Sequence, residues 1–154
     1  MEEIRVPEEE IITTMKLSLT TELPEIITEI NDEKQTEWLQ PFETVETDKT
    51  GIDQDRKPSA YICLTKTKKK IEDAFIEKGE YNLEIHTIFE EGREHERGFR
   101  YGAILYRLLK ISTLIPAVAD RVVLSEMEYI KNRNNINGKY SEAIFKIQII
   151  REGF

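Results

Sequence analysis

The stretch from Tyr81 to Glu90 most constrains what this chain can fold into. Apolar and polar residues alternate along most of it. Successive side chains of a β-strand point to opposite faces. One face of such a strand would carry Tyr81, Leu83, Ile85, Thr87 and Phe89. The alternation therefore predicts a strand with one face in the core.

A helix is predicted directly after this strand. The pair Glu91-Gly92 interrupts the alternation, and from about Glu94 the spacing of apolar residues lengthens to that of a helix. The predicted buried positions are Ile104, Leu105, Leu108 and Ile111, with Tyr101, Arg107 and Lys110 flanking them. A strand followed by an amphipathic helix is typical of a layered core, on which the other elements are expected to pack.

The N-terminal third predicts a helical region after a short arm. Residues 1–7 are expected to form a loose arm, and Pro7 suits the first turn of a helix. An apolar stripe then runs through Ile12, Met15, Leu19, Leu23, Ile26 and Ile30. Pro24 interrupts this stripe, because proline removes a backbone hydrogen bond inside a helix. The pattern predicts one kinked helix or two short helices in line, ending near Asn31-Asp32.

The middle of the chain predicts an exposed loop and then strands. Residues 43–57 are almost all polar and are expected to form a long exposed loop. Strands are predicted at 58–64 and 71–77, with a hairpin turn at Gly79 leading into the Tyr81 strand. The basic run Thr65–Lys70 between them is interpreted as a solvated loop or as a strand edge on which lysines block unwanted pairing.

The C-terminal part predicts a second hairpin. Pro116 is expected to end the helical region, and strands are predicted at 122–130 and 140–151 around the turn signal Asn137-Gly138. One face of the last strand would carry Ala143, Phe145, Ile147 and Ile149. The predicted fold class is α+β, an antiparallel or mixed sheet with two main helices packed on one face, in the order α-β-β-β-α-β-β.

Length and charge limit the class of protein further. The 154 residues predict a single domain, 1–154, and the net charge of −8 argues against direct binding to nucleic acid or anionic membrane. The single cysteine, Cys63, is interpreted as a small core residue, and its isolation fits a reducing compartment. The acidic N-terminus differs from the basic start of a signal peptide, so we expect synthesis into a cytoplasm.

The sequence contains no motif typical of catalysis. There is no nucleophile elbow, phosphate-binding loop, dinucleotide fingerprint or paired-cysteine motif. His86 falls within a strand, and His95 lies among Glu91, Glu94 and Glu96 at the start of a helix, where the possible ligands would point in different directions. Both histidines are interpreted as structural or solvated. The prediction is a protein that is not an enzyme, with no catalytic residues, no metal site and no cofactor.

Several segments, taken together, resemble a known family. They are Leu23-Pro24-Glu25-Ile26-Ile27 with Ile30-Asn31, Leu39-Gln40-Pro41, Lys57-Pro58-Ser59-Ala60-Tyr61-Ile62, the Tyr81–Glu90 strand with the charged helix after it, and the closing hairpin Val122–Arg151. In content and order they resemble the tail terminator proteins of tailed bacteriophages and related contractile particles, also called tail completion, minor tail or neck proteins. These motifs are architectural, and they assign no individual residue a role.

The resemblance implies a structural virion protein that assembles in the host bacterial cytoplasm. Its subunits would form a homo-oligomeric ring, usually a hexamer, at the head-proximal end of the tail tube. The expected partners are other copies of the chain, the tail tube protein, and the connector or neck proteins at the head-tail junction. Exposure suggests two interface segments, Glu43–Lys57 and Thr65–Lys70. The alternatives are another head-tail connector or neck completion protein, or a small non-catalytic ligand-binding or regulatory α+β domain.

Overall fold

Two prolines set the helix boundaries in the N-terminal third. The computed structural model describes residues 4–47, 58–73, 75–90, 94–135 and 138–152. Helix α1 (Pro7–Thr21) has Pro7 in its first turn, followed by three glutamates that the helix dipole favours there. Helix α2 (Leu23–Lys34) has Pro24 in its first turn and ends at Gln35, whose φ is 53°. The break at Pro24 therefore separates two helices and does not merely kink one.

The strands that the structure describes form one mixed sheet. They are β1 (Thr44–Glu46), β2 (Ser59–Glu72), β3 (Phe75–Glu90), β4 (Arg121–Asn135) and β5 (Gly138–Glu152). Their order across the sheet is β1-β2-β3-β5-β4, and only the β1–β2 pair is parallel. Helix α3 (Glu94–Ile111) and the short 3-10 helix η2 (Ile115–Ala117) connect β3 to β4. The predicted α+β class is confirmed, and the predicted order of elements agrees roughly with the structure, with α1 and α2 together forming the first helical region.

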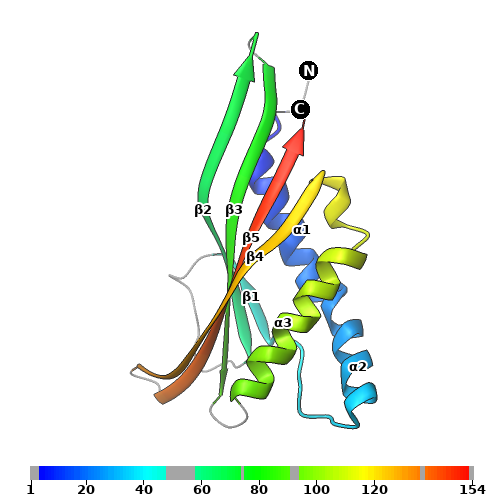
Figure 1. Ribbon diagram of the computed structural model, residues 1–154, viewed down its shortest axis with the longest axis vertical. Helices are drawn as coiled ribbons and strands as arrows, with labels where there is room; N and C mark the ends of the chain where they lie inside the picture. Colours follow the sequence, from blue (N-terminus) through cyan, green and yellow to red (C-terminus); the bar gives the residue numbers. More distant parts are fainter. Residues whose placement is uncertain (1–3, 48–57, 74, 91–93, 136–137, 153–154) are drawn as a thin grey trace.

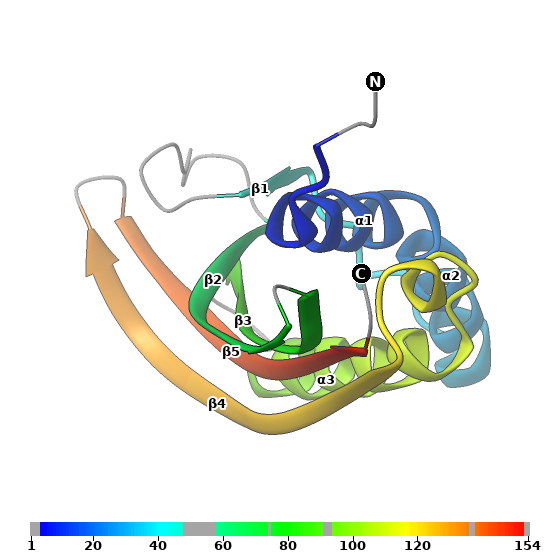
Figure 2. The same ribbon diagram turned by 90° about the horizontal axis from the view of Figure 1, so that it is seen from above.

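The helices cover one face of the sheet (Figure 1). The sheet is curved, and β1 and β4 lie on its opposite sides (Figure 2). One hydrophobic core joins the helices to the strands; among its members are Ile11, Met15, Leu19, Leu23, Ile62, Leu83, Ile85, Ile104, Leu108, Phe145 and Ile147. The face predicted for the Tyr81 strand is buried at all five positions, as are the four predicted positions of the last strand.

The predicted turn at Gly79 and the separate strand at 71–77 are wrong. Strand β2 continues through the lysine run to Glu72, and the chain reverses next to Asp73, whose φ is 49°. Gly79 instead lies inside β3, where a Cβ atom would come within 2.5 Å of the Tyr81 hydroxyl oxygen. Gly79 leaves room for the Tyr81 ring on the same strand face. The glycine is therefore explained by the close approach of this ring to the backbone and not by a turn.

Other predicted boundaries also need correction. The predicted loop at 43–57 begins with strand β1, in which Val45 is buried, and residues 48–57 lie outside the described part of the chain. Ile111 was predicted to be buried but is exposed, because it is the last residue of α3. Cys63 is half-buried beside Tyr61 and Ile88, on the sheet face away from the helices.

Both C-terminal strands are longer than predicted. Their pairing extends to Asn135 and Gly138, as expected for a hairpin, although the turn residues 136–137 are not among those described. In the N-terminal arm, residues 1–3 are not described, and Ile4 is exposed. The Arg5 side chain forms an ion pair with Glu10 at 2.8 Å, so this part of the arm has a side-chain contact with α1.

Candidate functional site

The sheet face away from the helices forms a polar groove. Its volume is about 360 Å³, and its lining comes from β2, β3, β4 and β5: Thr65, Asn82, Leu83, Glu84, Ser125, Lys146, Ile147 and Gln148. We call this side of the sheet the open face. Alternate residues of each strand reach it, which is why the polar positions of β3 and β5 gather there.

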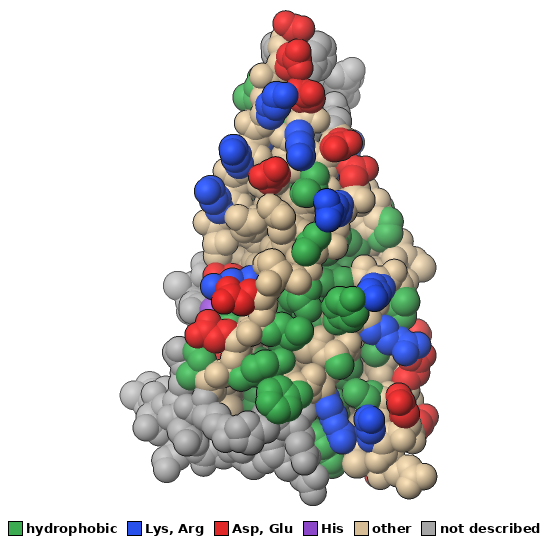
Figure 3. Space-filling model, in the orientation of Figure 1, with side chains coloured by type: hydrophobic (Ala, Val, Ile, Leu, Met, Phe, Trp, Pro, Cys, Tyr) green, Lys and Arg blue, Asp and Glu red, His purple; other side chains and the backbone are tan. Residues whose placement is uncertain are grey.

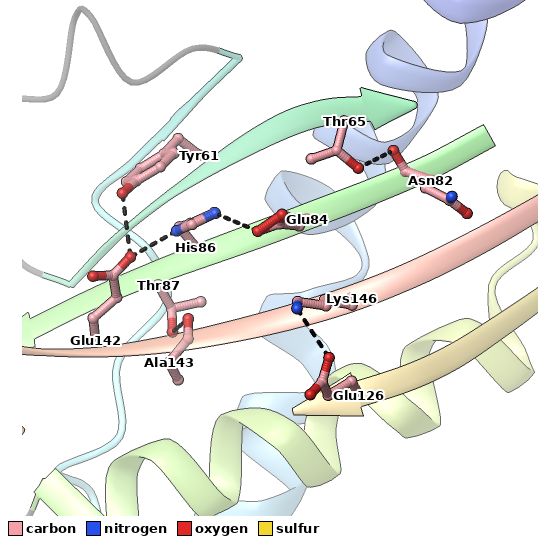
Figure 4. A network of polar contacts seen from close by, with 10 residues as sticks. All are labelled: Tyr61, Thr65, Asn82, Glu84, His86, Thr87, Glu126, Glu142, Ala143 and Lys146. Carbon is pink, nitrogen blue, oxygen red and sulfur yellow. Dashed lines mark hydrogen bonds and ion pairs between the residues drawn. The ribbon is translucent and has the colours of Figure 1, made fainter. Parts of the chain in front are cut away.

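Two hydroxyl-bearing residues shape the ends of this groove. The pairing of β2 with β3 shifts between Leu64 and Lys66, and the pairing of β4 with β5 shifts between Leu124 and Glu126. Thr65 and Ser125 lie at these irregularities. Each hydroxyl donates a 3.1 Å hydrogen bond to a backbone carbonyl of the neighbouring strand, Thr65 to that of Asn82 (Figure 4) and Ser125 to that of Lys146. Such bulges bend a strand and strengthen its twist.

A buried polar network lies further along the open face (Figure 4). His86 on β3 places Nδ1 2.6 Å from a carboxylate oxygen of Glu142 on β5, and Nε2 3.2 Å from a carboxylate oxygen of Glu84. Tyr61 on β2 donates its hydroxyl proton to the same Glu142 oxygen at 3.3 Å. The Tyr61 and His86 rings are stacked with centroids 4.8 Å apart.

This geometry favours a structural role for His86. Both of its ring nitrogens face carboxylate oxygens, which can only accept hydrogen bonds when ionised. The side chains of His86 and Glu142 are buried, with 4% and 3% of their surface exposed. A general acid or base must reach a substrate proton directly or through a water molecule, and neither nitrogen is open to one. The network instead ties β2, β3 and β5 together.

The second histidine falls where side chains are not described. Glu91 lies outside the described residues, and only the backbone helix is described for Glu94, His95 and Glu96. Within the described part of the chain, no group of three or more His, Cys, Asp and Glu side chains could hold a metal ion. None of the helices described there is long and apolar enough to cross a membrane.

Exposed hydrophobic side chains gather between α3 and β4 (Figure 3). Phe99 contacts Tyr129 edge to face with ring centroids 4.9 Å apart, and the Tyr129 hydroxyl lies 3.5 Å from the sulfur of Met127. Phe99 is 55% exposed, and Met127 and Tyr129 also present large exposed surfaces. We call these three residues the α3–β4 aromatic surface.

Two glycines allow β4 to approach α3 at this surface. A Cβ atom on Gly98 would lie 2.8 Å from the Tyr129 ring, and one on Gly102 would lie 2.8 Å from the Met127 sulfur. The sequence prediction missed this surface, because its members are about thirty positions apart in the chain. The Gly-x-x-x-Gly spacing on one helix face was the signal that could have indicated it.

The lysine-rich segment Thr65–Lys70 lies on a strand edge, one of the two predicted interpretations. Strand β1 pairs with β2 only from Ser59 to Tyr61, and no described strand pairs with that edge beyond it. Lys69 forms an ion pair with Glu8 of α1 at 2.6 Å, and Lys70 forms one with Glu77 at 3.2 Å. Lysines on an edge strand discourage pairing with a like strand.

No protein-family model matches the chain, and no curated protein matches its sequence. The site is therefore interpreted from its geometry alone. Its parts are a polar groove, an exposed aromatic surface, and two strand edges that no described strand covers.

Proposed function

We propose that the protein is a structural assembly subunit, a tail terminator that forms a closed ring at the head-proximal end of a phage tail tube. In this role it stops growth of the tube and joins the tail to the neck, and it acts without catalysis or a cofactor. It assembles in the cytoplasm of the bacterial host and remains in the virion. The sequence resemblance provides the specific role, and the surface of the subunit supports assembly.

One observation carries the proposal. Each side of the sheet ends in an edge that no described strand covers, β2 beyond Tyr61 and β4, and exposed apolar side chains lie near both. Contiguous apolar patches on a protein surface mark contact with other molecules, and the α3–β4 aromatic surface is such a group of neighbouring side chains. Two different contact surfaces on opposite sides of one subunit are what a ring needs, since each copy must bind two neighbours.

The polar groove favours one competing function. A cleft of about 360 Å³ lies within the range of small-molecule sites, so a ligand-binding or regulatory domain remains the second candidate. Ligand pockets, however, are lined mostly by apolar and aromatic side chains. Most of the residues that line this groove are polar, which favours the assembly function. Another neck or connector protein is a further candidate, and it would bind on the head side and not on the tube.

Light scattering and electron microscopy test the proposal. The purified protein is measured across a concentration series, alone and with tail tubes of the particle that encodes it. We expect a ring-sized species, or capture at one end of the tube only. A protein that remains a monomer and ignores the tubes would contradict the terminator function, and binding to isolated heads without tubes would favour the connector alternative.

A further inference from the structure

The two open edges differ in charge. On β2, the stretch after Tyr61 carries Lys66, Lys68, Lys69 and Lys70, with Glu72 as its one acidic residue. On β4, the exposed Arg121 begins the strand, the exposed middle carries Glu126 and Glu128, and the basic residues Lys131 and Arg133 follow. The β2 edge beyond Tyr61 is therefore mainly basic, and the middle of the β4 edge is acidic. In the register of one sheet Glu126 lies level with Cys63, so contact between these glutamates and the lysines requires neighbouring subunits to be offset along the strands.

These opposite charges lie on the same face of the sheet. Lys66 and Lys68 pair in register with Asn82 and Glu80 of β3, and Glu126 and Glu128 pair with Lys146 and Ile144 of β5. These even-numbered β3 and β5 positions belong to the open face, which Asn82, Glu84 and Lys146 line. If β4 of one copy lay beside β2 of another with the open faces aligned, glutamates and lysines would meet as cross-strand neighbours.

Strand direction permits such a contact. The pairs β2–β3, β3–β5 and β5–β4 are all antiparallel, so β4 runs opposite to β2 within one sheet. A second copy placed in the same orientation at the β4 edge would present its β2 antiparallel to β4. The alternation of strand directions would then continue from one subunit to the next.

Exposed apolar residues on the helix side of the sheet also form two groups, one near the β4 edge and one near the β2 edge. Phe99, Tyr106, Met127 and Tyr129 lie on the β4 side, Val6, Leu17 and Ile71 lie on the α1 and β2 side, and Ile4 and Ile111 are also exposed, at the N-terminal arm and the end of α3. Ile71 is 65% exposed near the end of β2. A contact between unlike edges would bring apolar groups together on the helix side and opposite charges together on the open face.

We propose that the occupant of each edge is a second copy of this chain, with β4 of one subunit paired antiparallel to β2 of the next. This inference rests on the proposed ring function and names its interface. A register with Met127 opposite Thr67 places Glu126 opposite Lys68 and Glu128 opposite Lys66. In that register the pairing uses β2 between Cys63 and Glu72, the part that β1 leaves open.

Charge explains why unlike edges pair. Two β2 edges would bring lysines together, and two β4 edges would bring Glu126 and Glu128 together, so self-pairing of either edge is disfavoured. In the mixed register given above, Glu126 and Glu128 each lie opposite a lysine. Such a contact is heterologous and produces a ring when the rotation between copies closes.

A charge-reversal experiment tests this pairing. One variant carries Lys66→Glu and Lys68→Glu, so the positions proposed to pair are acidic on both of its edges. The other carries Glu126→Lys and Glu128→Lys, so these positions are basic on both edges. We expect each variant alone to associate at least about tenfold more weakly than the native chain. An equimolar mixture is expected to recover the native mass by light scattering, because acidic-edged and basic-edged subunits can alternate.

The outcomes separate the interface from the function. If the native chain forms rings but the mixture does not recover, or if either variant alone assembles normally, the edge pairing is wrong while the ring proposal stands. If the native chain is a monomer with and without tubes, the ring function itself fails. Thermal unfolding of each variant is the control for folding, because Glu126→Lys also removes the 2.9 Å ion pair with Lys146.

Disulfide trapping tests the register even when association is weak. Two variants, Thr67→Cys and Met127→Cys, are each made in a Cys63→Ala background, given tags of different mass, mixed and oxidised. We expect the mixed dimer to exceed either like dimer. A predominance of like dimers, or no crosslink at a concentration where the native chain assembles, would overturn the proposed pairing.

Discussion

Single polar residues hold the elements of this subunit together at defined junctions. Glu22, between α1 and α2, accepts hydrogen bonds from Ser18 at 2.6 Å and from the Thr113 backbone N–H at 2.9 Å, and it also binds the Ser112 hydroxyl. It therefore connects the helix junction to the turn after α3. Arg151 on β5 donates a 2.6 Å hydrogen bond to the Glu10 carboxylate and so connects β5 to α1. None of these partners is close in sequence except Ser18, so the sequence alone could not predict them.

The pKa of Glu22 gives a prediction about stability. Partial burial alone would raise this pKa, but the hydrogen bonds from Ser112, Ser18 and Thr113 outweigh it and the pKa is lowered from 4.5. A lowered carboxyl pKa stabilises the fold above the ordinary pKa, and this stabilisation is lost as pH falls through the lowered value. We expect Glu22→Gln to reduce the free energy of unfolding by about 1–3 kcal/mol at pH 7.

Urea unfolding at pH 7 and at about pH 3 measures this effect. The difference between the native chain and Glu22→Gln should shrink at the lower pH, where the native carboxyl becomes protonated. Glu25→Gln is the matched control, since Glu25 is exposed in the same segment and should change stability by about 0.5 kcal/mol or less. A difference for Glu22 that does not depend on pH would contradict this explanation.

Tyr81 provides a second prediction at this scale. Its side chain is buried, burial raises the pKa of its hydroxyl, and the hydroxyl has no hydrogen-bond partner among the described residues. A buried polar group without a partner is destabilising. We expect Tyr81→Phe to leave the unfolding free energy unchanged or to raise it by up to about 1 kcal/mol, measured by thermal or urea unfolding. A clear loss of stability would show that the hydroxyl has a partner.

At the scale of elements, side-chain alternation predicted more than turn signals did. The buried faces of β3 and β5 follow from alternating residues, because one face of each strand meets the helices. Gly79 was misread because glycine serves equally in a turn or at a close approach, and the Tyr81 ring decides between them. Asp73 adopts positive φ in the turn between β2 and β3, and nothing in the sequence distinguished it from other acidic residues.

The candidate site was predictable only in part. The lysine run indicated a strand edge, because lysines on an edge strand block unwanted pairing with other strands. The His86–Glu142 contact and the α3–β4 aromatic surface join residues from different elements. They depend on the order of strands across the sheet, which hairpin signals alone do not determine.

The two glycines of α3 provide a prediction about helix packing. Alanine at either position gains about 1 kcal/mol of helix propensity over glycine. At Gly98 the new Cβ would meet the edge of the Tyr129 ring, whereas at Gly102 it would meet the flexible end of Met127 and the tip of Tyr129. We expect Gly98→Ala to destabilise the fold by about 1–3 kcal/mol and Gly102→Ala to be within about 1 kcal/mol of neutral.

Chemical denaturation of both variants measures this difference, and each serves as the control for the other. Equal effects would contradict the close approach at Gly98. If Gly98→Ala in a Tyr129→Ala background recovers the lost stability, the collision with the ring is the cause.

At the scale of the whole molecule, the opposite charges of the β2 and β4 edges predict that assembly depends on salt. Salt screens exposed charges, with a Debye length of about 10 Å at 0.1 M and about 3 Å at 1 M. We expect the midpoint concentration for assembly to rise with ionic strength, measured by light scattering across a dilution series. The reverse, tighter assembly at high salt, would show that apolar contacts at the α3–β4 aromatic surface dominate the interface.

The short strand β1 has a consequence for accuracy of assembly. Hydrogen bonding between strands repeats along the chain, so two long edges can join in many registers that differ by two residues. Because β1 already occupies β2 from Ser59 to Tyr61, an arriving strand cannot slide past that point. The three paired residues of β1 would thus block displacement of the arriving strand toward Ser59. Register errors between neighbouring subunits could then occur only in the opposite direction, toward the far end of β2.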